Sequence, residues 1–305
     1  MFPIIPAASA AESGNQEGIF GFGMTGVYLS MTNLVSNAGV VGTDVTGVGT
    51  VRRALAACEY GGDKGIFGYG YGVTGSNITV STTNLVSNAG VVATDTTGVG
   101  TARMRVAACN YGGDRDKGIF GFGKTGSYAS MTNLVSNAGV VGTDVTGVGT
   151  ARQHLAACEY GEDKGIFGFG YNGSVLGMTN LVSNVGVVAT DVTAVGTARG
   201  RPAACKYGGD KGIFGFGYDD GTATKLSMTN LVSNAGVVAT DTTGVGTAKY
   251  SLAACEYGGD KGIFGYGYAA SYSSTTNLVS NAGVVGTDVT GVGTARYGPA
   301  ACSFN

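Results

Sequence analysis

Short apolar and aromatic stretches, separated by Gly, Asn and Asp, follow one another along almost the whole chain. In the unit from residue 54 to residue 100, the runs rich in β-branched and aromatic residues have the length of strands, and Gly-Gly-Asp and Asn-Ala-Gly clusters stand between them. Such clusters supply the left-handed residues that tight hairpin turns need. We therefore expect four antiparallel strands in this unit, at residues 55–60, 65–71, 81–87 and 91–97.

This pattern occurs six times. The stretch GDKGIFGYG at residues 62–70 returns in nearly the same form, and its Gly-Ile-Phe segment begins at Gly18, Gly65, Gly118, Gly165, Gly212 and Gly262. The starts of successive copies lie 47, 53, 47, 47 and 50 residues apart. Repeats of this length with four antiparallel strands each are typical of propeller blades, because one unit cannot bury its own faces.

The sequence thus predicts an all-β chain folded as a six-bladed β-propeller of four-stranded antiparallel blades. The first unit begins at its second strand, and the chain stops after an isolated first strand at residues 297–305. We expect this C-terminal strand to join the N-terminal blade and close the ring, which removes open sheet edges. A similar segment at residues 6–9 competes for that place but lies two residues too far from its next strand. The units are expected at residues 18–53, 54–103, 104–152, 153–199, 200–249 and 250–296.

Residues 1–17 precede the first repeat. This segment has no basic start, and its apolar stretch is too short for a signal peptide, so we expect it to be retained. We interpret it as an arm that docks on a partner through Phe2, Ile4 and Ile5. The other interpretation is a frayed terminus.

Composition excludes several classes of protein. The formal net charge is −2 and only 12% of residues are charged, which argues against a nucleic-acid binder that must neutralise phosphates. No apolar run reaches the 18 or so residues of a membrane-spanning helix, so we expect no membrane span.

The six cysteines each occur in the phrase Ala-Ala-Cys, once per repeat. Equivalent positions around a ring lie too far apart for a disulfide unless they line a narrow axis. Cys-x-x-Cys spacing, which would indicate a metal site, is absent. We therefore expect reduced, buried thiols that act as small apolar side chains.

The units resemble the kelch repeat. In the third unit, Arg103, Ala107-Ala108-Cys109, Tyr111-Gly112-Gly113, the GIFGFG strand and Asp144 follow the kelch order. The outer Trp of that pattern is missing, and the glycine pair follows the first strand rather than the second. The chain also resembles tandem-repeat structural proteins of marine bacteriophages, and this resemblance implies a location in a virion.

Variation between the six units falls on one face of the expected propeller. The turns GGDK and SNAG hardly change, whereas the segments joining the second and third strands and the residue pair after each Thr-Ala-Arg do change. In an up-and-down blade, both variable connections lie at the same end. We call this end the diversified face. It has the character of a binding surface, although drift of unselected loops gives the same pattern. Its tyrosines include Tyr71, Tyr171, Tyr218 and Tyr268.

The diversified face also carries a cationic residue at one repeated position, and we expect this set to belong to the ligand-binding face: Arg52, Arg103, Arg152, Arg199, Lys249 and Arg296. Further basic residues follow at Arg53, Arg105, His154 and Arg201. Gathered at a channel mouth, such groups would hold an anion such as a phosphate or an acidic sugar. The alternative is that each repeated cation pairs with the backbone or an Asp of a neighbouring blade.

The sequence offers no catalytic constellation. His154 is the only histidine, and the repeated aspartates Asp44, Asp95, Asp144, Asp191, Asp241 and Asp288 stand alone in their units. Calcium requires clustered oxygen ligands, so turn capping is the better explanation for these aspartates. We expect no enzymatic activity, no cofactor and no metal.

These observations predict a structural or interaction module of a phage virion, in its tail, fibre or decoration, or of another surface. Its partners would be other virion or surface proteins through the arm, and glycans or anionic groups on the diversified face. The alternative is a multivalent glycan-binding lectin. We expect synthesis in the cytoplasm without a signal peptide and a final location in the virion or outside the cell after release.

Overall fold

The structure, a computed structural model, describes residues 16–73, 77–193 and 195–304. Within these residues the regular elements are β-strands and one short 3₁₀ helix, η1 (Gly113–Arg115). The all-β class expected from the sequence is confirmed. Among the described residues, no helix is long and apolar enough to cross a membrane.

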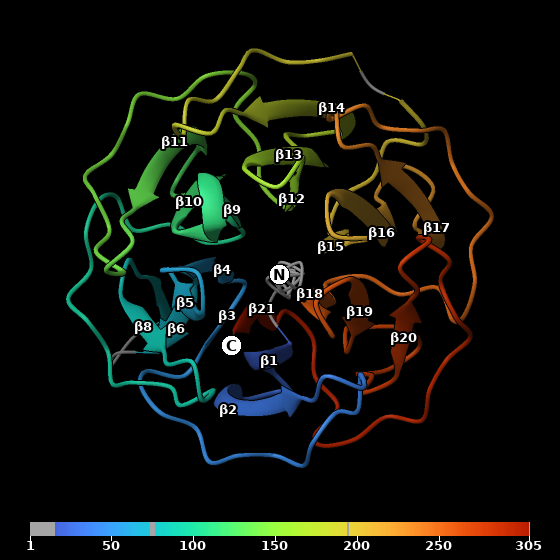
Figure 1. Ribbon diagram of the computed structural model, residues 1–305, viewed down its shortest axis with the longest axis horizontal. Helices are drawn as coiled ribbons and strands as arrows, with labels where there is room; N and C mark the ends of the chain where they lie inside the picture. The colour runs from blue at the N-terminus through green and yellow to red at the C-terminus, as the bar shows by residue number, and fades with distance from the viewer. Residues whose placement is uncertain (1–15, 74–76, 194, 305) are drawn as a thin grey trace, which may run out of the picture.

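Six antiparallel sheets of three strands share one plan, in which an inner strand pairs with a central strand and the central strand pairs with an outer one (Figure 1). Written from the inner to the outer strand, they are β21-β1-β2 (Ala300–Phe304, Glu17–Met24, Tyr28–Val35), β4-β5-β8 (Ala56–Tyr60, Lys64–Gly68, Thr83–Val86), β9-β10-β11 (Ala107–Tyr111, Lys117–Lys124, Tyr128–Val135), β12-β13-β14 (Ala156–Tyr160, Lys164–Tyr171, Val175–Val182), β15-β16-β17 (Ala203–Tyr207, Lys211–Asp219, Thr224–Val232) and β18-β19-β20 (Ala253–Tyr257, Lys261–Gly265, Thr276–Val279). A small seventh sheet, β3-β6-β7 (Arg52–Arg53, Tyr71–Val73, Asn77–Thr79), joins the end of the first unit to the second unit.

The sheets lie side by side around a common axis, with their inner strands nearest to it (Figure 1). Each inner strand contacts the inner strand of the next sheet, and the last one, β21, contacts the β4 strand of the second unit. The inner strands in chain order are β4, β9, β12, β15, β18 and β21. The C-terminal strand pairs with the first strand of the chain, as expected, with Glu17 opposite Phe304 and Gly21 opposite Ala300.

The expectation of four-stranded sheets is wrong. The segment after each outer strand makes only isolated bridges to it, for example Val86 to Val92 and Thr83 to Thr96. Side chains add to the few backbone hydrogen bonds of this segment: Asp95 accepts hydrogen bonds from the Thr50 amide at 2.9 Å and from Asn84 Nδ2 at 2.9 Å. Thr50 belongs to the preceding unit, so the repeated aspartates join neighbouring units rather than cap turns within one.

The core lies between neighbouring sheets. The rings of Phe22 on β1 and Phe67 on β5 meet edge to face, with their centroids 5.2 Å apart. The Gly in each Gly-Ile-Phe segment faces the cysteine of the preceding sheet, since a Cβ on Gly118 would lie 2.5 Å from Cys58 Sγ. All six cysteines are free and buried, as expected from the sequence.

The repeated cation completes the packing between sheets at five positions. The guanidiniums of these arginines donate from Nη2 to the Oδ1 of a buried asparagine on an outer strand, at 2.5 to 2.7 Å. The pairs are Arg52–Asn84, Arg103–Asn133, Arg152–Asn180, Arg199–Asn230 and Arg296–Asn33. The sixth unit has Lys249, whose Nζ donates to Thr275 instead, and Asn277 Oδ1 has no hydrogen-bond partner among the described residues.

Changing Lys249→Arg is expected to raise the free energy of unfolding by about 1–2 kcal/mol, because the guanidinium would reach the buried, unpaired Asn277 Oδ1. Burial also lowers the pKa of Lys249 to about 8, whereas it lowers the pKa of the equivalent Arg152 only to about 10, so an arginine keeps its charge more firmly near neutral pH. Urea unfolding at pH 7 measures the effect. The reverse change, Arg152→Lys, should lower stability, and a lower midpoint for Lys249→Arg would refute the explanation.

Candidate functional site

A closed ring of backbone hydrogen bonds surrounds the axis at the diversified face. Its members lie two residues before each inner strand, and each amide donates to the carbonyl of the equivalent residue in the preceding unit, at 2.7 to 3.2 Å. They are Ala54, Arg105, His154, Arg201, Ser251 and Gly298. We call them the rim residues. The Ala54 amide donates to the Gly298 carbonyl, the Gly298 amide donates to the Ser251 carbonyl, and the series continues until it returns to Ala54. The closed cycle therefore holds the backbones of all six units at the same height along the axis.

The rim residues all adopt the left-handed conformation, with φ between 51° and 66°. This conformation costs a residue with a Cβ on the order of 1 kcal/mol, and glycine avoids the cost. Only Gly298 is a glycine. Phe22 and its equivalents have the same left-handed backbone conformation, and their rings fill the core. The rim residues Arg105, His154 and Arg201 instead line a cavity. Strain of this kind persists at binding sites, where a side chain is needed in that place.

The cavity inside the rim, which we call the axial mouth, has a volume of about 570 Å³. Its floor is a ring of apolar residues that lie one position after the rim residues: Leu55, Val106, Leu155, Pro202, Leu252 and Pro299. Its wall carries Arg53, Arg105, His154, Arg201, Tyr218, Asp220, Tyr250 and Tyr297. The axial mouth therefore combines an apolar floor with a wall of guanidiniums and phenols.

The guanidiniums of the wall differ in their partners. Arg201 forms an ion pair with Asp220 at 3.0 Å. Arg53 donates to the Tyr297 hydroxyl at 2.6 Å, and Arg105 donates to Gln153 Oε1 at 2.9 Å. Both acceptors are neutral, and the Nε of Arg53 is buried without a hydrogen-bond partner among the described residues. The wall thus holds two cations that no carboxylate of the described residues compensates.

The pKa values reflect this concentration of positive charge. Burial, and next the nearby Arg53 and Arg201, lower the pKa of Arg105. Burial, followed by Arg105, Arg201, Arg53 and Lys124, lowers the pKa of His154 well below its ordinary value. His154 is therefore neutral at pH 7, and the guanidiniums supply the charge of the axial mouth.

The repeated cations predicted to form a binding face do not lie on one. Arg52, Arg103, Arg152, Arg199, Lys249 and Arg296 have no exposed surface, and the arginines are held by backbone and asparagine oxygens. The second interpretation from the sequence, pairing with neighbouring units, describes their contacts. Side chains alternate along an extended segment, so Arg52 points between sheets while the next residue, Arg53, reaches the axial mouth.

The four predicted tyrosines are half-buried on the diversified face, and only Tyr218 lines the axial mouth. Tyr71 and Tyr268 lie one contact away: Arg53 lies 5.8 Å from the Tyr71 ring centroid, and the Tyr268 ring packs against Tyr250 and Tyr297. Tyr171 packs instead against Tyr128. Tyr250 and Tyr297 follow Thr-Ala-Lys and Thr-Ala-Arg, in the residue pair that varies between units, and this variation was the signal for them.

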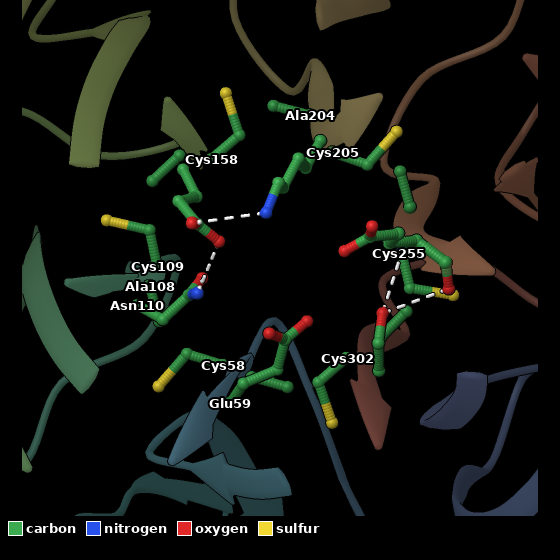
Figure 2. A pocket seen from close by; sticks show the side chains of 18 residues that line it. Cys58, Glu59, Ala108, Cys109, Asn110, Cys158, Ala204, Cys205, Cys255 and Cys302 are labelled. Atoms are coloured by element: carbon green, nitrogen blue, oxygen red, sulfur yellow. Dashed lines mark hydrogen bonds and ion pairs between the residues drawn. The ribbon is translucent and has the colours of Figure 1, made fainter. Parts of the chain in front are cut away.

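Beyond the floor, the axis narrows to a cavity of about 50 Å³ between the inner strands. Figure 2 shows the labelled cysteine thiols pointing away from this cavity and Glu59 lying beside it. Glu159 accepts from Asn110 at 2.6 Å and pairs with Lys206 at 3.2 Å. Burial raises the pKa of Glu256 to about 8. Among the described residues, no group of three or more His, Cys, Asp or Glu is arranged to hold a metal ion.

Arg115 pairs with glutamates that line this narrow cavity, and it was not among the residues predicted from the sequence. Its guanidinium lies 3.1 Å from Glu256 and 3.5 Å from Glu159. Arg115 belongs to η1, in the turn between β9 and β10. That turn reads Gly-Gly-Asp-Arg-Asp-Lys, two residues longer than the Gly-Gly-Asp-Lys of the second unit. The added length was the available signal.

The predicted docking residues Phe2, Ile4 and Ile5 lie outside the described residues. Comparison of the chain with protein-family models and with curated proteins gives no match. Arguments about function therefore rest on the geometry of the axial mouth and on the differences between the repeats.

Proposed function

We propose that this chain is a six-bladed β-propeller that acts as a non-enzymatic interaction module and binds its partner at the diversified face. One observation carries the proposal: most residues of the pair that varies after each Thr-Ala-Arg or Thr-Ala-Lys line the axial mouth of otherwise similar repeats. The ring of contacts between inner strands and the pairing of β21 with β1 support the propeller.

The contrast between conserved scaffold and varied rim supports a binding role. Each outer strand ends in Thr-Asn-Leu-Val in all six units, and each inner strand begins with Ala-Ala-Cys. The rim position, by contrast, holds Ala, Arg, His, Arg, Ser and Gly in turn. A rigid scaffold with varied residues at one end is the common arrangement of binding proteins. Arginine and tyrosine, which dominate the wall, are also the residues most often found at the energetic centres of interfaces.

The setting that we propose is a virion or another surface, with residues 1–17 as the arm that docks on the larger assembly. This part of the proposal follows the resemblance to phage tandem-repeat proteins. Its test is to ask whether an antibody against the folded chain labels purified particles. Detection of the chain only in the soluble fraction of infected or producing cells would contradict it.

A glycan-binding lectin is the second candidate. The observation that favours it is the wall itself, where tyrosine rings, hydroxyls and guanidiniums surround one cavity. Such groups bind both the apolar faces and the hydroxyls of sugars. In this form the lectin would have one axial site in addition to any sites between units.

The proposed function predicts that binding depends on the axial mouth. Arg53→Gln/Arg105→Gln should lower binding to an array of glycans and peptides at least tenfold, because two central cations are lost. The matched control is Lys164→Gln/Lys261→Gln, which removes the same charge from turns after the inner strands, where each lysine pairs with an exposed aspartate. Equal binding by the two double variants would place the interaction elsewhere and refute the proposal.

A further inference from the structure

The axial mouth has an excess of positive charge. Among the residues that the structure describes, Arg53 and Arg105 have only neutral hydrogen-bond partners within a partly buried concavity, and Arg201 is the one guanidinium of the wall with a carboxylate partner. Like charges held close together in a desolvated site destabilise one another, and a bound anion relieves that repulsion. A guanidinium binds a carboxylate, sulfate or phosphate through two parallel N–H donors, so this pair of residues matches an oxyanion.

The axial mouth is also much larger than one oxyanion. Its volume of about 570 Å³ lies within the usual range of small-molecule sites, roughly 300–1,000 Å³. The apolar floor, including Leu55, Leu252 and Pro299, would contact the non-polar part of a ligand. A free inorganic ion would occupy only the region beside the guanidiniums and leave this floor uncovered.

The rim residues are distributed asymmetrically, so a ligand would bind in one orientation. Arg105, His154 and Arg201 follow one another on one side, whereas the other side carries the small residues Ser251, Gly298 and Ala54. The rings of Tyr250 and Tyr297 stand next to the small side and offer flat apolar surfaces with hydroxyls. Neutral His154 and Ser251 add groups that donate or accept hydrogen bonds. This combination suits a ligand that has both apolar C–H faces and many hydroxyl groups.

We propose that the axial mouth is a binding site for an acidic sugar, with its oxyanion between Arg53 and Arg105 and its ring on the apolar floor beside Tyr250 and Tyr297. This inference rests on the proposed function and names the ligand class of the same site. The oxyanion can be the carboxylate of a uronic acid or a sulfate or phosphate ester, since all three present the same oxygen geometry to a guanidinium.

The test is titration calorimetry of the full chain at low salt with glucuronate, glucose 6-sulfate, glucose 6-phosphate, glucose and inorganic sulfate. At least one charged sugar is expected to bind tenfold or more tightly than glucose and inorganic sulfate. Arg53→Gln/Arg105→Gln should weaken that binding at least tenfold, and Lys164→Gln/Lys261→Gln should leave it within twofold. Circular dichroism and thermal melting of both variants establish that they are folded.

Three results would overturn the inference. Glucose binding as tightly as the charged sugars would show that the anionic group does not contribute to binding. Inorganic sulfate binding as tightly as glucose 6-sulfate would remove the role of the sugar ring. Absence of binding by every charged sugar would remove both. Array binding that is lost in the mouth variant while no acidic sugar binds would leave the proposed function standing and refute only the ligand class.

Discussion

Stability is expected to fall steeply above about pH 9, by roughly 8 kcal/mol per pH unit once the thiols of the unfolded chain are ionised. Burial raises the pKa of all six cysteines, with neighbouring cysteines or glutamates as the next cause. In the unfolded chain, a thiol ionises near pH 8.5. The folded state therefore holds protons that the unfolded state has lost, and each thiol removes about 1.4 kcal/mol of stability per pH unit.

Other groups change this slope only slightly. Burial raises the pKa of Tyr69 and Tyr266 to about 12, which adds to the loss above pH 10. Lys249 acts in the opposite direction, because its pKa of about 8 in the folded state lies below that in the unfolded chain, so stability rises between these two values. Between pH 9 and pH 10, one lysine against six thiols leaves the net sign negative. Arg52, Arg152 and Arg199, whose pKa burial lowers to about 10, oppose the loss only above that pH.

Urea unfolding under reducing conditions at pH 7, 8, 9 and 10 measures this dependence. The variant Cys58→Ala/Cys158→Ala starts from a lower stability, but its slope above pH 9 should be about one third smaller because two of six titrating groups are gone. A free energy of unfolding that stays constant from pH 7 to pH 10 would contradict the buried thiols.

Replacing Arg152 by Met is expected to lower the free energy of unfolding by about 3–5 kcal/mol, the usual loss when one partner of a buried charged cluster is removed. The guanidinium donates to the Phe169 carbonyl at 2.8 Å, the Thr150 carbonyl at 3.0 Å and Asn180 Oδ1 at 2.7 Å. It also lies 4.3 Å from the centroid of the Phe122 ring on the neighbouring sheet. The methionine would fill much of the space but leave these acceptors unpaired.

Thermal or urea unfolding of Arg152→Met measures the loss, and Lys164→Met is the control. Lys164 is partly exposed and paired only with Asp163, so its change should stay within about 0.5 kcal/mol. A loss for Arg152→Met as small as that of the control would mean that the buried arginines do not hold neighbouring sheets together.

The sequence predicted those features that depend on local pattern. The Gly-Ile-Phe and Ala-Ala-Cys strands are short, apolar and bounded by turn residues, so their positions and their antiparallel pairing could be predicted. The missing first strand of the first unit and the surplus one at the end predicted that β21 would pair with β1. The cysteines were recognised as buried because they recur once per repeat within an apolar strand.

Features that depend on contacts between units could not be predicted in this way. The fourth segment looked like a strand, but it makes only isolated bridges to the outer strand, and Asp95 bonds to Thr50 of the preceding unit. Arg52 is buried between sheets and Arg53 lines the axial mouth, because opposite sides of an extended segment face in opposite directions. The sequence does not show which of the two sides faces the axis. The position of Arg115 depends on how a turn two residues longer folds over Glu159 and Glu256. The cycle of rim hydrogen bonds has no signal in one unit, because every bond joins two units.

The central claim, that acidic sugars bind in the axial mouth, is tested most directly by titrating glucuronate, glucose 6-sulfate and glucose 6-phosphate into uniformly ¹⁵N-labelled protein and following the backbone amide signals. The account predicts saturable shifts concentrated at rim residues such as Arg105, His154 and Ser251 and at Tyr250 and Tyr297, with none in the turns at Gly161 and Gly258. Shifts confined to those turns, or no shifts at saturating ligand, would contradict it.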